Sequence, residues 1–141
     1  MTPFTLCAAT SSGNPHNNHY PNHHHITDQT SLEQVAWLDH VAATYTGDRR
    51  SSASFISSDC VVMDIDNDHT DNPDEWITPD DLAELMAGVE FMTATSRNHQ
   101  KPKRTLSARP RFHVYFPISP VTDADTYAGS VSYTHLRAHE T

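Results

Sequence analysis

The chain has 141 residues, which suits one domain of ordinary size, and its net charge of −9 argues at first sight against a nucleic-acid partner. Hydrophobic residues make up 36% of the chain and its mean hydropathy is −0.61, so we expect part of it to lack structure. No stretch approaches the roughly 18 apolar residues of a membrane helix, and the N-terminus has no secretory signal, which predicts a cytoplasmic protein without a membrane partner.

The first 30 residues are poor in apolar side chains, so we predict a disordered, His- and Asn-rich segment over residues 1–30. Its run PHNNHYPNHHH has neither the fixed spacing nor the carboxylates of a transition-metal site. Ordered structure is predicted to begin at Ser31, which forms a capping-box pattern with Gln34. Apolar residues then recur at helical spacing as far as Tyr45, and Trp37 is interpreted as a core residue.

The elements that follow alternate between strand and helix. The apolar, β-branched run CVVMDI at residues 60–65 predicts a buried strand. A second helix is predicted from Thr78, a capping residue followed by Pro, as far as Gly88. The segments VEFMTAT (residues 89–95) and FHVYFPI (residues 112–118) predict two strands. This order predicts an α+β fold in which the last two strands pair as an antiparallel hairpin.

The end of the chain has a different character. Its last residues, VSYTHLRAHET, resemble the translated read-through of a transposase-type sequencing-library adapter. We therefore predict a non-native tail over residues 130–141 and a native chain interrupted near Gly129, and we leave the tail out of the fold prediction. Residues 31–129 are left for the folded domain.

Asp64 and Asp66 end the predicted strand at residues 60–65. Side chains two residues apart on a strand share a face, with Cα atoms about 6.5 Å apart, so both carboxylates can hold the same divalent cation or a pair of cations. Hard oxygen ligands favour Mg²⁺ or Mn²⁺. Manganese-dependent glycosyltransferases and several phosphotransferases use Asp-x-Asp in this position, and the pattern also fits two solvated carboxylates at a strand end.

The stretch DIDNDHTDNPDE, residues 64–75, is also compatible with an EF-hand calcium loop. The ligand positions of such a loop are taken here by Asp64, Asp66, Asp68, Thr70, Asn72 and Glu75. Two features disagree, because His69 stands where the loop needs Gly and a strand-like segment stands where an EF-hand has its entering helix. Calcium binding stays open as an alternative function.

The charged residues fall into two blocks. Eleven of the eighteen acidic residues lie in residues 59–90, and six of the nine basic residues lie in residues 97–111. The six are Arg97, Lys101, Lys103, Arg104, Arg109 and Arg111. This order suits a site that holds cations and phosphates side by side, and it also suits two solvated loops of opposite sign. His113, on the next predicted strand, is either a half-buried sheet residue or a phosphate contact beside these cations.

Three segments resemble the primase-polymerases of phages and other mobile elements, which belong to the archaeo-eukaryotic primase superfamily. They are RSSASFISSDCVVMDIDNDHTD, WITPDDL and SRNHQKPKRTLSARPRFHVYFPIS, in this order, over roughly residues 49–119. The resemblance implies that residues 31–129 are the N-terminal part of a primase-polymerase catalytic domain, with a sheet similar to that of an RNA-recognition module. It implies a DNA primase or polymerase in the replication of a phage or mobile element.

The resemblance also assigns roles to individual residues. The first motif of the family, Asp-x-Asp, matches Asp64 and Asp66 and makes them ligands of Mg²⁺ or Mn²⁺. The second motif centres on a histidine that contacts the phosphates of the incoming nucleotide, and it matches His113. That motif is commonly small-x-His, and this chain departs from it with an arginine. Contacts to phosphates or to the template backbone are implied for Arg97, Lys101, Lys103, Arg109, Arg111 and His113.

The reaction implied by the resemblance is template-directed nucleotidyl transfer by two divalent metal ions. The implied partners are a DNA template and primer, nucleoside triphosphates, and a helicase domain or protein. The third motif of the family supplies another carboxylate and lies beyond this chain. We therefore expect little or no primer synthesis from the chain as it stands.

Overall fold

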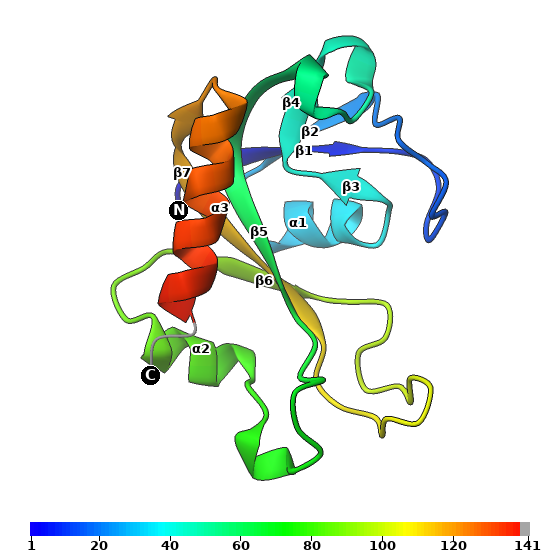
Figure 1. The fold of residues 1–141 in the computed structure, drawn as a ribbon, viewed down its shortest axis with the longest axis vertical. Coiled ribbons are helices and arrows are strands. Elements are labelled where there is room, and N and C mark those ends of the chain that lie inside the picture. The colour runs from blue at the N-terminus through cyan, green and yellow to red at the C-terminus, as the bar shows by residue number, and fades with distance from the viewer. Residues whose placement is uncertain (139–141) are drawn as a thin grey trace.

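The computed structural model describes the backbone of residues 1–138 and the side chains of residues 1–134. Helices and strands are mixed, and antiparallel strands curl into a half-barrel (Figure 1). A three-stranded sheet has the order β2-β1-β3, and a four-stranded sheet has the order β4-β5-β7-β6. The α+β class that the sequence predicts is confirmed.

The strands are β1 (Phe4–Ala8), β2 (Asn22–Ile26), β3 (His40–Val41), β4 (Ala43–Tyr45), β5 (Phe55–Ile65), β6 (Met92–Thr95) and β7 (Phe112–Val121). The α-helices are α1 (Gln29–Ala36), α2 (Pro79–Leu85) and α3 (Ala124–Ala138). Short 3₁₀ turns lie at Thr46–Asp48, Ser52–Ser54 and Pro73–Glu75. Neighbouring strands are antiparallel in both sheets.

The disordered segment predicted over residues 1–30 is not confirmed, because these residues form β1 and β2. β1 is the central strand of the three-stranded sheet, and its Phe4 and Leu6 side chains are fully buried. β2 is an edge strand with mostly exposed polar side chains, and its last residue, Ile26, is fully buried. Burial of a few apolar side chains therefore holds this polar segment in the fold. The average composition of residues 1–30 does not reveal these side chains.

The first helix starts earlier and is shorter than predicted. Its capping box joins Asp28 to Ser31, not Ser31 to Gln34: Asp28 Oδ1 accepts the N–H of Ser31 at 2.8 Å, and Ser31 Oγ accepts the N–H of Asp28 at 3.1 Å. The helix ends at Ala36, and the segment predicted to continue it to Tyr45 forms β3 and β4. These strands pair with β1 and β5, so pairing with distant strands outweighs the helical periodicity.

The elements predicted between residues 60 and 118 are present. β5 contains the predicted strand and begins earlier, at Phe55. α2 follows Thr78, whose Oγ1 accepts the N–H of Asp81 at 3.2 Å while the Asp81 carboxylate accepts the N–H of Thr78 at 2.9 Å. β6 and β7 pair antiparallel, as predicted.

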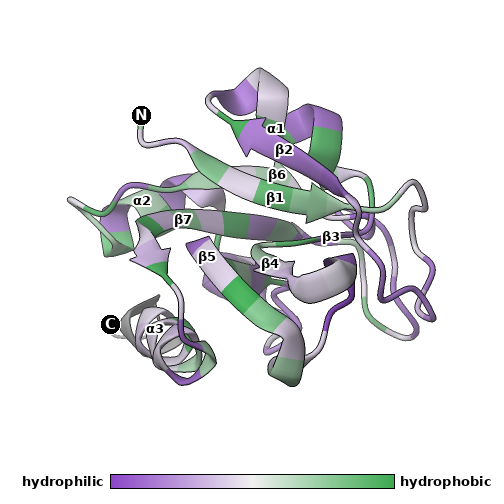
Figure 2. Cartoon of the chain, turned by 90° about the horizontal axis from the view of Figure 1, so that it is seen from above, coloured by the Kyte–Doolittle hydropathy of each residue, from purple (hydrophilic) through white to green (hydrophobic). Residues whose placement is uncertain are grey.

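The middle of the four-stranded sheet is buried on both faces. One face packs against β1 and α1 in a cluster that includes Phe4, and the other packs against α2 and α3 in a cluster that includes Leu82 (Figure 2). Successive residues of β5 alternate between these clusters, with Cys60 in the first and Val61 in the second. Burial on both faces explains why residues 60–63 of the strand are an unbroken apolar run.

α3 packs on β5, where the hydroxyl of Tyr127 donates a hydrogen bond to the carbonyl of Cys60 at 3.0 Å. The helix continues through residue 130, where the foreign tail is predicted to start, and residues 139–141 of that tail lie outside the described residues. The foreign origin of the tail stays a prediction. Within residues 1–138, no helix has the length and apolar character needed to cross a membrane.

Candidate metal- and phosphate-binding cleft

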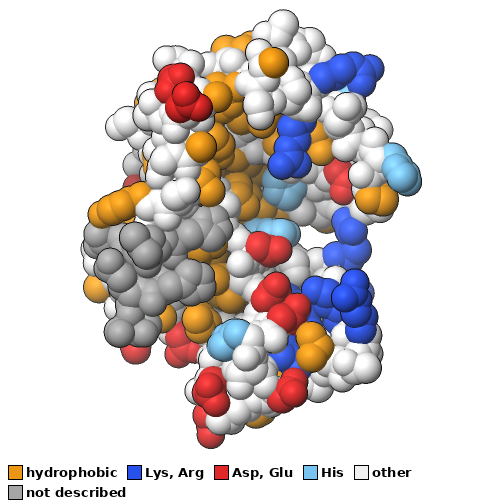
Figure 3. Space-filling model, viewed as in Figure 1, with side chains coloured by type: hydrophobic (Ala, Val, Ile, Leu, Met, Phe, Trp, Pro, Cys, Tyr) orange, Lys and Arg blue, Asp and Glu red, His pale blue; other side chains and the backbone are white. Residues whose placement is uncertain are grey.

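A cleft of about 830 Å³ lies between the segment that joins α1 to β4 and the C-terminal end of β5. Figure 3 shows histidine and acidic side chains next to one another in this hollow, with Lys and Arg side chains along its rim. The fold therefore brings members of the acidic and basic blocks of the sequence to one place: Asp64 and Asp66, and Arg97, Lys103 and Arg111.

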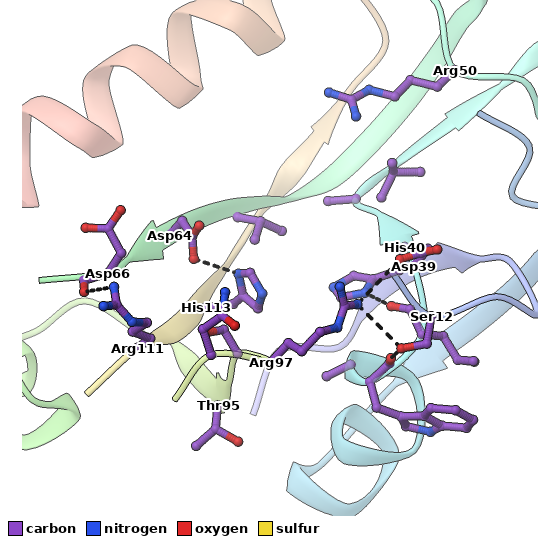
Figure 4. Close-up of a pocket in the computed structure, with 18 of the residues that line it drawn as sticks. Ser12, Asp39, His40, Arg50, Asp64, Asp66, Thr95, Arg97, Arg111 and His113 are labelled. Atoms are coloured by element: carbon purple, nitrogen blue, oxygen red, sulfur yellow. Dashed lines mark hydrogen bonds and ion pairs between the residues drawn. The ribbon is translucent and has the colours of Figure 1, made fainter. Parts of the chain in front are cut away.

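Asp64 and Asp66 both line the cleft, and Ile65 between them is buried in the core. The alternation of a strand therefore turns both carboxylates away from the core. β5 and β7 place Asp64 directly opposite His113, and His113 Nδ1 lies 3.1 Å from Asp64 Oδ1 (Figure 4). Nδ1 of His113 therefore faces the Asp64 carboxylate, and Nε2 is the ring nitrogen left for a ligand.

The turn after Asp66 is fixed by Asn67. The backbone of Asn67 is left-handed, with a φ of 58°, which Asn tolerates better than most residues. Its buried amide donates to the carbonyl groups of Ile77 at 2.9 Å and Pro110 at 2.8 Å, and its Oδ1 accepts the N–H of Ile77 at 2.8 Å. Asn67 therefore ties the end of β5 to two distant segments, a role that no sequence pattern marks.

Arg111 lines the cleft with a side chain that is only 2% exposed. Its Nη1 is paired with the Asp68 carboxylate and donates to the Asp66 carbonyl at 2.8 Å, and Lys103 Nζ lies 3.1 Å from the other Asp68 oxygen. The hydrogen bond from Arg111 is the main reason that the pKa of Asp68 is lowered. Arg111 Nε and Nη2 are buried and have no hydrogen-bond partner among the described residues, so two donors of this cation are unsatisfied beside the cleft.

Arg109 does not line the cleft, although the sequence predicts a phosphate contact for it. Its side chain is fully buried, and its Nη1 donates to the carbonyl groups of Asn67 at 2.9 Å and Thr70 at 2.7 Å. Its Nε and Nη2 donate to Ser107 and Asp71, and its guanidinium lies 5.0 Å from the ring centre of Trp76. All its N–H groups are occupied, so Arg109 supports the loop after β5 and has no donor left for a phosphate.

The remaining predicted cations divide between the cleft and the surface. Arg97 lines the cleft, 59% exposed, with Nη2 3.4 Å from Ser12 Oγ and 3.8 Å from Asp39 Oδ1. Lys103 also lines it. Lys101 and Arg104 are exposed in the connection between β6 and β7 and do not line the cleft.

Sequence reasoning missed His40, which lines the cleft beside His113. The two rings meet edge to face with centres 6.2 Å apart. His40 Nδ1 lies 2.7 Å from the Leu38 carbonyl, so it is the donor, and Nε2 accepts the hydroxyl of Tyr115 at 2.8 Å. Burial lowers the pKa of His40 and raises that of Tyr115, which keeps both groups neutral.

Trp37 is a cleft residue for which the sequence prediction was wrong. It was expected in the core, and its side chain is 63% exposed in the lining of the cleft. The residue lies at the C-terminal cap of α1, one position beyond the helix, so the apolar stripe that carries Leu32 and Val35 into the core does not include it.

The carboxylates present fit a divalent cation such as Mg²⁺ or Mn²⁺. No cluster of three or more His, Cys, Asp or Glu side chains that could hold a metal is found among the described residues. Mg²⁺ is commonly bound through one or two carboxylates, substrate phosphates and water, so Asp64 and Asp66 are a sufficient donor set. The geometry favours an EF-hand less, because Asp68 is engaged by Arg111 and Lys103.

No protein-family model matches this chain, and neither curated proteins nor solved structures give a match. The functional conclusion therefore depends on the geometry of the cleft and on the sequence motifs that meet there.

Proposed function

We propose that this chain is the metal- and nucleotide-binding part of a template-directed DNA primase-polymerase. The observation that supports this most is the meeting of Asp64, Asp66 and His113 in one cleft, with the unsatisfied donors of Arg111 beside them. The two segments that carry these residues resemble the first and second motifs of the primase-polymerases. Carboxylates for cations and cations for phosphates are the groups that nucleotidyl transfer needs.

The order of the elements supports the same proposal. β5, α2, β6, β7 and α3 follow one another as the first five elements of a βαββαβ unit do, and β7 lies between β5 and β6 as in a split βαβ arrangement. An RNA-recognition module has a four-stranded sheet of this kind. The resemblance to primase-polymerases predicts such a sheet.

Each residue of the cleft has a distinct task in the proposed activity. Asp64 and Asp66 hold the divalent cation, and His113, whose Nδ1 faces Asp64, presents Nε2 to a phosphate oxygen. Arg111 places a buried cation beside the triphosphate site, and Arg97 adds charge farther along the cleft. A bound divalent cation supplies charge neutralisation on the triphosphate and activation of the attacking 3′-hydroxyl.

One edge of β5 is unpaired beside the cleft in the part of the chain that the structure describes. Along residues 59–65, β5 pairs with β7 on one side and with no other strand among the described residues. The last strand of a βαββαβ unit belongs beside the first, and the resemblance assigns a third carboxylate to a further motif. We therefore expect cation and nucleotide binding from this chain, and primer synthesis only with an added carboxylate at this edge.

The proposal is tested by Mn²⁺ titration in the presence of dTTP, followed by electron paramagnetic resonance of the free ion. We expect the double variant Asp64→Asn, Asp66→Asn to bind Mn²⁺ at least about tenfold more weakly than the unchanged chain, a loss of about 1.4 kcal/mol. Glu75→Gln is the matched control, because it removes an exposed carboxylate of the same loop outside the cleft lining. Equal affinity in the double variant, or a preference for Ca²⁺ that depends on Glu75, contradicts the proposal.

A further inference from the structure

Trp37 is an exposed indole in the wall of a charged cleft. Among the described residues, Trp37 is the only exposed large apolar side chain that lines the cleft with Asp64. Trp is on average a strongly buried residue type, and its placement here exposes a broad aromatic face to the space where the proposed function puts nucleic acid.

The indole is held in a fixed position. Its Nε1 donates to the carbonyl of Gln34 at 3.0 Å, and the Trp37 carbonyl accepts the hydroxyl of Ser12 at 2.5 Å. The turn that contains Ser12 is anchored in its turn by Asp39, which accepts N–H groups from Gly13 at 2.7 Å and Asn14 at 2.9 Å. A ring that is already ordered loses little freedom when a flat ligand stacks on it.

Cationic side chains share this wall and the one opposite. Arg97 donates to Ser12, the same side chain that binds the Trp37 carbonyl, and Arg50 extends toward the cleft from the other side (Figure 4). An aromatic face in the same cleft as cations that attract a phosphate backbone is a combination that proteins use for single-stranded nucleic acid. Aromatic stacking tolerates every base, which suits an enzyme that leaves base choice to template pairing.

We propose that Trp37 is a stacking platform for a nucleobase bound in the cleft. The identity of the ligand as a nucleobase rests on the proposed function. The position of the site rests on the exposed, fixed indole of Trp37. The base belongs either to a nucleic-acid strand or to a free nucleotide, and the two sources share the same stacking chemistry.

The test is fluorescence anisotropy of labelled oligothymidylate in EDTA, with the full chain and its variants. Trp37→Leu keeps an apolar side chain and removes the aromatic face, so we expect binding to weaken roughly 5- to 150-fold. Trp37→Phe keeps an aromatic face and is expected to stay within roughly fivefold of the unchanged chain. Leu85→Ala is the control, since Leu85 is an exposed apolar side chain on α2 outside the cleft.

Free dTTP, added as competitor and measured directly with Mn²⁺, separates the two sources. If Trp37→Leu weakens the binding of oligothymidylate and leaves dTTP binding unchanged, the base belongs to a strand. If it weakens the binding of both probes, the platform accepts the base of a strand and that of a free nucleotide. Unchanged binding of both probes in Trp37→Leu, or no binding of either by the unchanged chain, overturns the inference.

The Asp64→Asn, Asp66→Asn variant distinguishes this inference from the proposed function. In EDTA, Trp37→Leu added to this variant is still expected to weaken oligothymidylate binding roughly 5- to 150-fold, because stacking on the indole involves no cation. If the double variant binds Mn²⁺ as tightly as the unchanged chain while Trp37→Leu still weakens oligothymidylate binding, the metal site is refuted and the stacking platform stands.

Discussion

Replacement of Arg109 by Met separates a structural cation from a phosphate-binding one. Met preserves the apolar bulk of the side chain and removes every donor of the guanidinium. We expect the variant to be destabilised without a direct effect on the ligand, because Arg109 is fully buried and lies outside the cleft.

The magnitude follows from what happens to the acceptors that Arg109 leaves behind. Asp71 is 82% exposed, so its carboxylate is solvated without Arg109 and adds little to the loss. The carbonyl groups of Asn67 and Thr70 lie in buried and partly buried surroundings and lose their partner. An unsatisfied buried acceptor costs about 1–3 kcal/mol, so with a discount for Thr70 we expect a loss of about 2–4 kcal/mol.

Urea unfolding, followed by circular dichroism, measures this loss as a change in the free energy of unfolding. Arg97→Met is the matched control, and because Arg97 is 59% exposed we expect it to change stability by less than about 0.5 kcal/mol. Arg109→Lys restores the charge without the planar fork and is expected to recover less than half of the loss. An Arg109→Met variant that unfolds at the original urea concentration but loses dTTP affinity would refute this reasoning.

Two further predictions concern the same loop. Asn67→Ala and Asn67→Gly both remove the side-chain hydrogen bonds, and the Ala variant also places a Cβ in a left-handed conformation, so we expect it to be about 1 kcal/mol less stable than the Gly variant in urea unfolding. Equal stabilities would mean that the backbone relaxes away from the positive φ. Folding lowers the pKa of Asp68, chiefly through the hydrogen bond from Arg111, so its stabilising contribution is complete above the unfolded pKa of about 3.9 and is lost as the pH falls through the lower folded pKa. Asp68→Asn is expected to flatten the acid limb of a stability-against-pH curve, and an unaltered acid limb would show that Asp68 does not carry it.

Sequence reasoning succeeded where the signal is local. The run CVVMDI at residues 60–65 predicts a buried strand, and the Thr78 cap predicts the start of α2, because both patterns depend on residues next to one another. The position of Asp64 and Asp66 on one face follows from the geometry of a strand alone. The pairing of β6 with β7 also follows from the order of the elements.

Local signals failed where the partners are distant in the chain. β1 and β3 are short and weakly marked, and they exist because they pair with each other while β1 packs against α1 and the larger sheet. The exposed Trp37 and the half-buried His40 belong to the same short segment, and their different surroundings come from the strands and turns packed against it.

The clearest case is the basic block. The sequence shows that these cations follow the acidic segment, and it does not distinguish the surroundings of Arg97, Arg109 and Arg111. Only the tertiary structure decides that Arg97 is solvated, that Arg109 is saturated by carbonyl groups of the loop after β5, and that Arg111 keeps unsatisfied donors beside the cleft. The reason is physical: the role of a charged side chain depends on its solvation and on the acceptors around it, and residues far along the chain supply both.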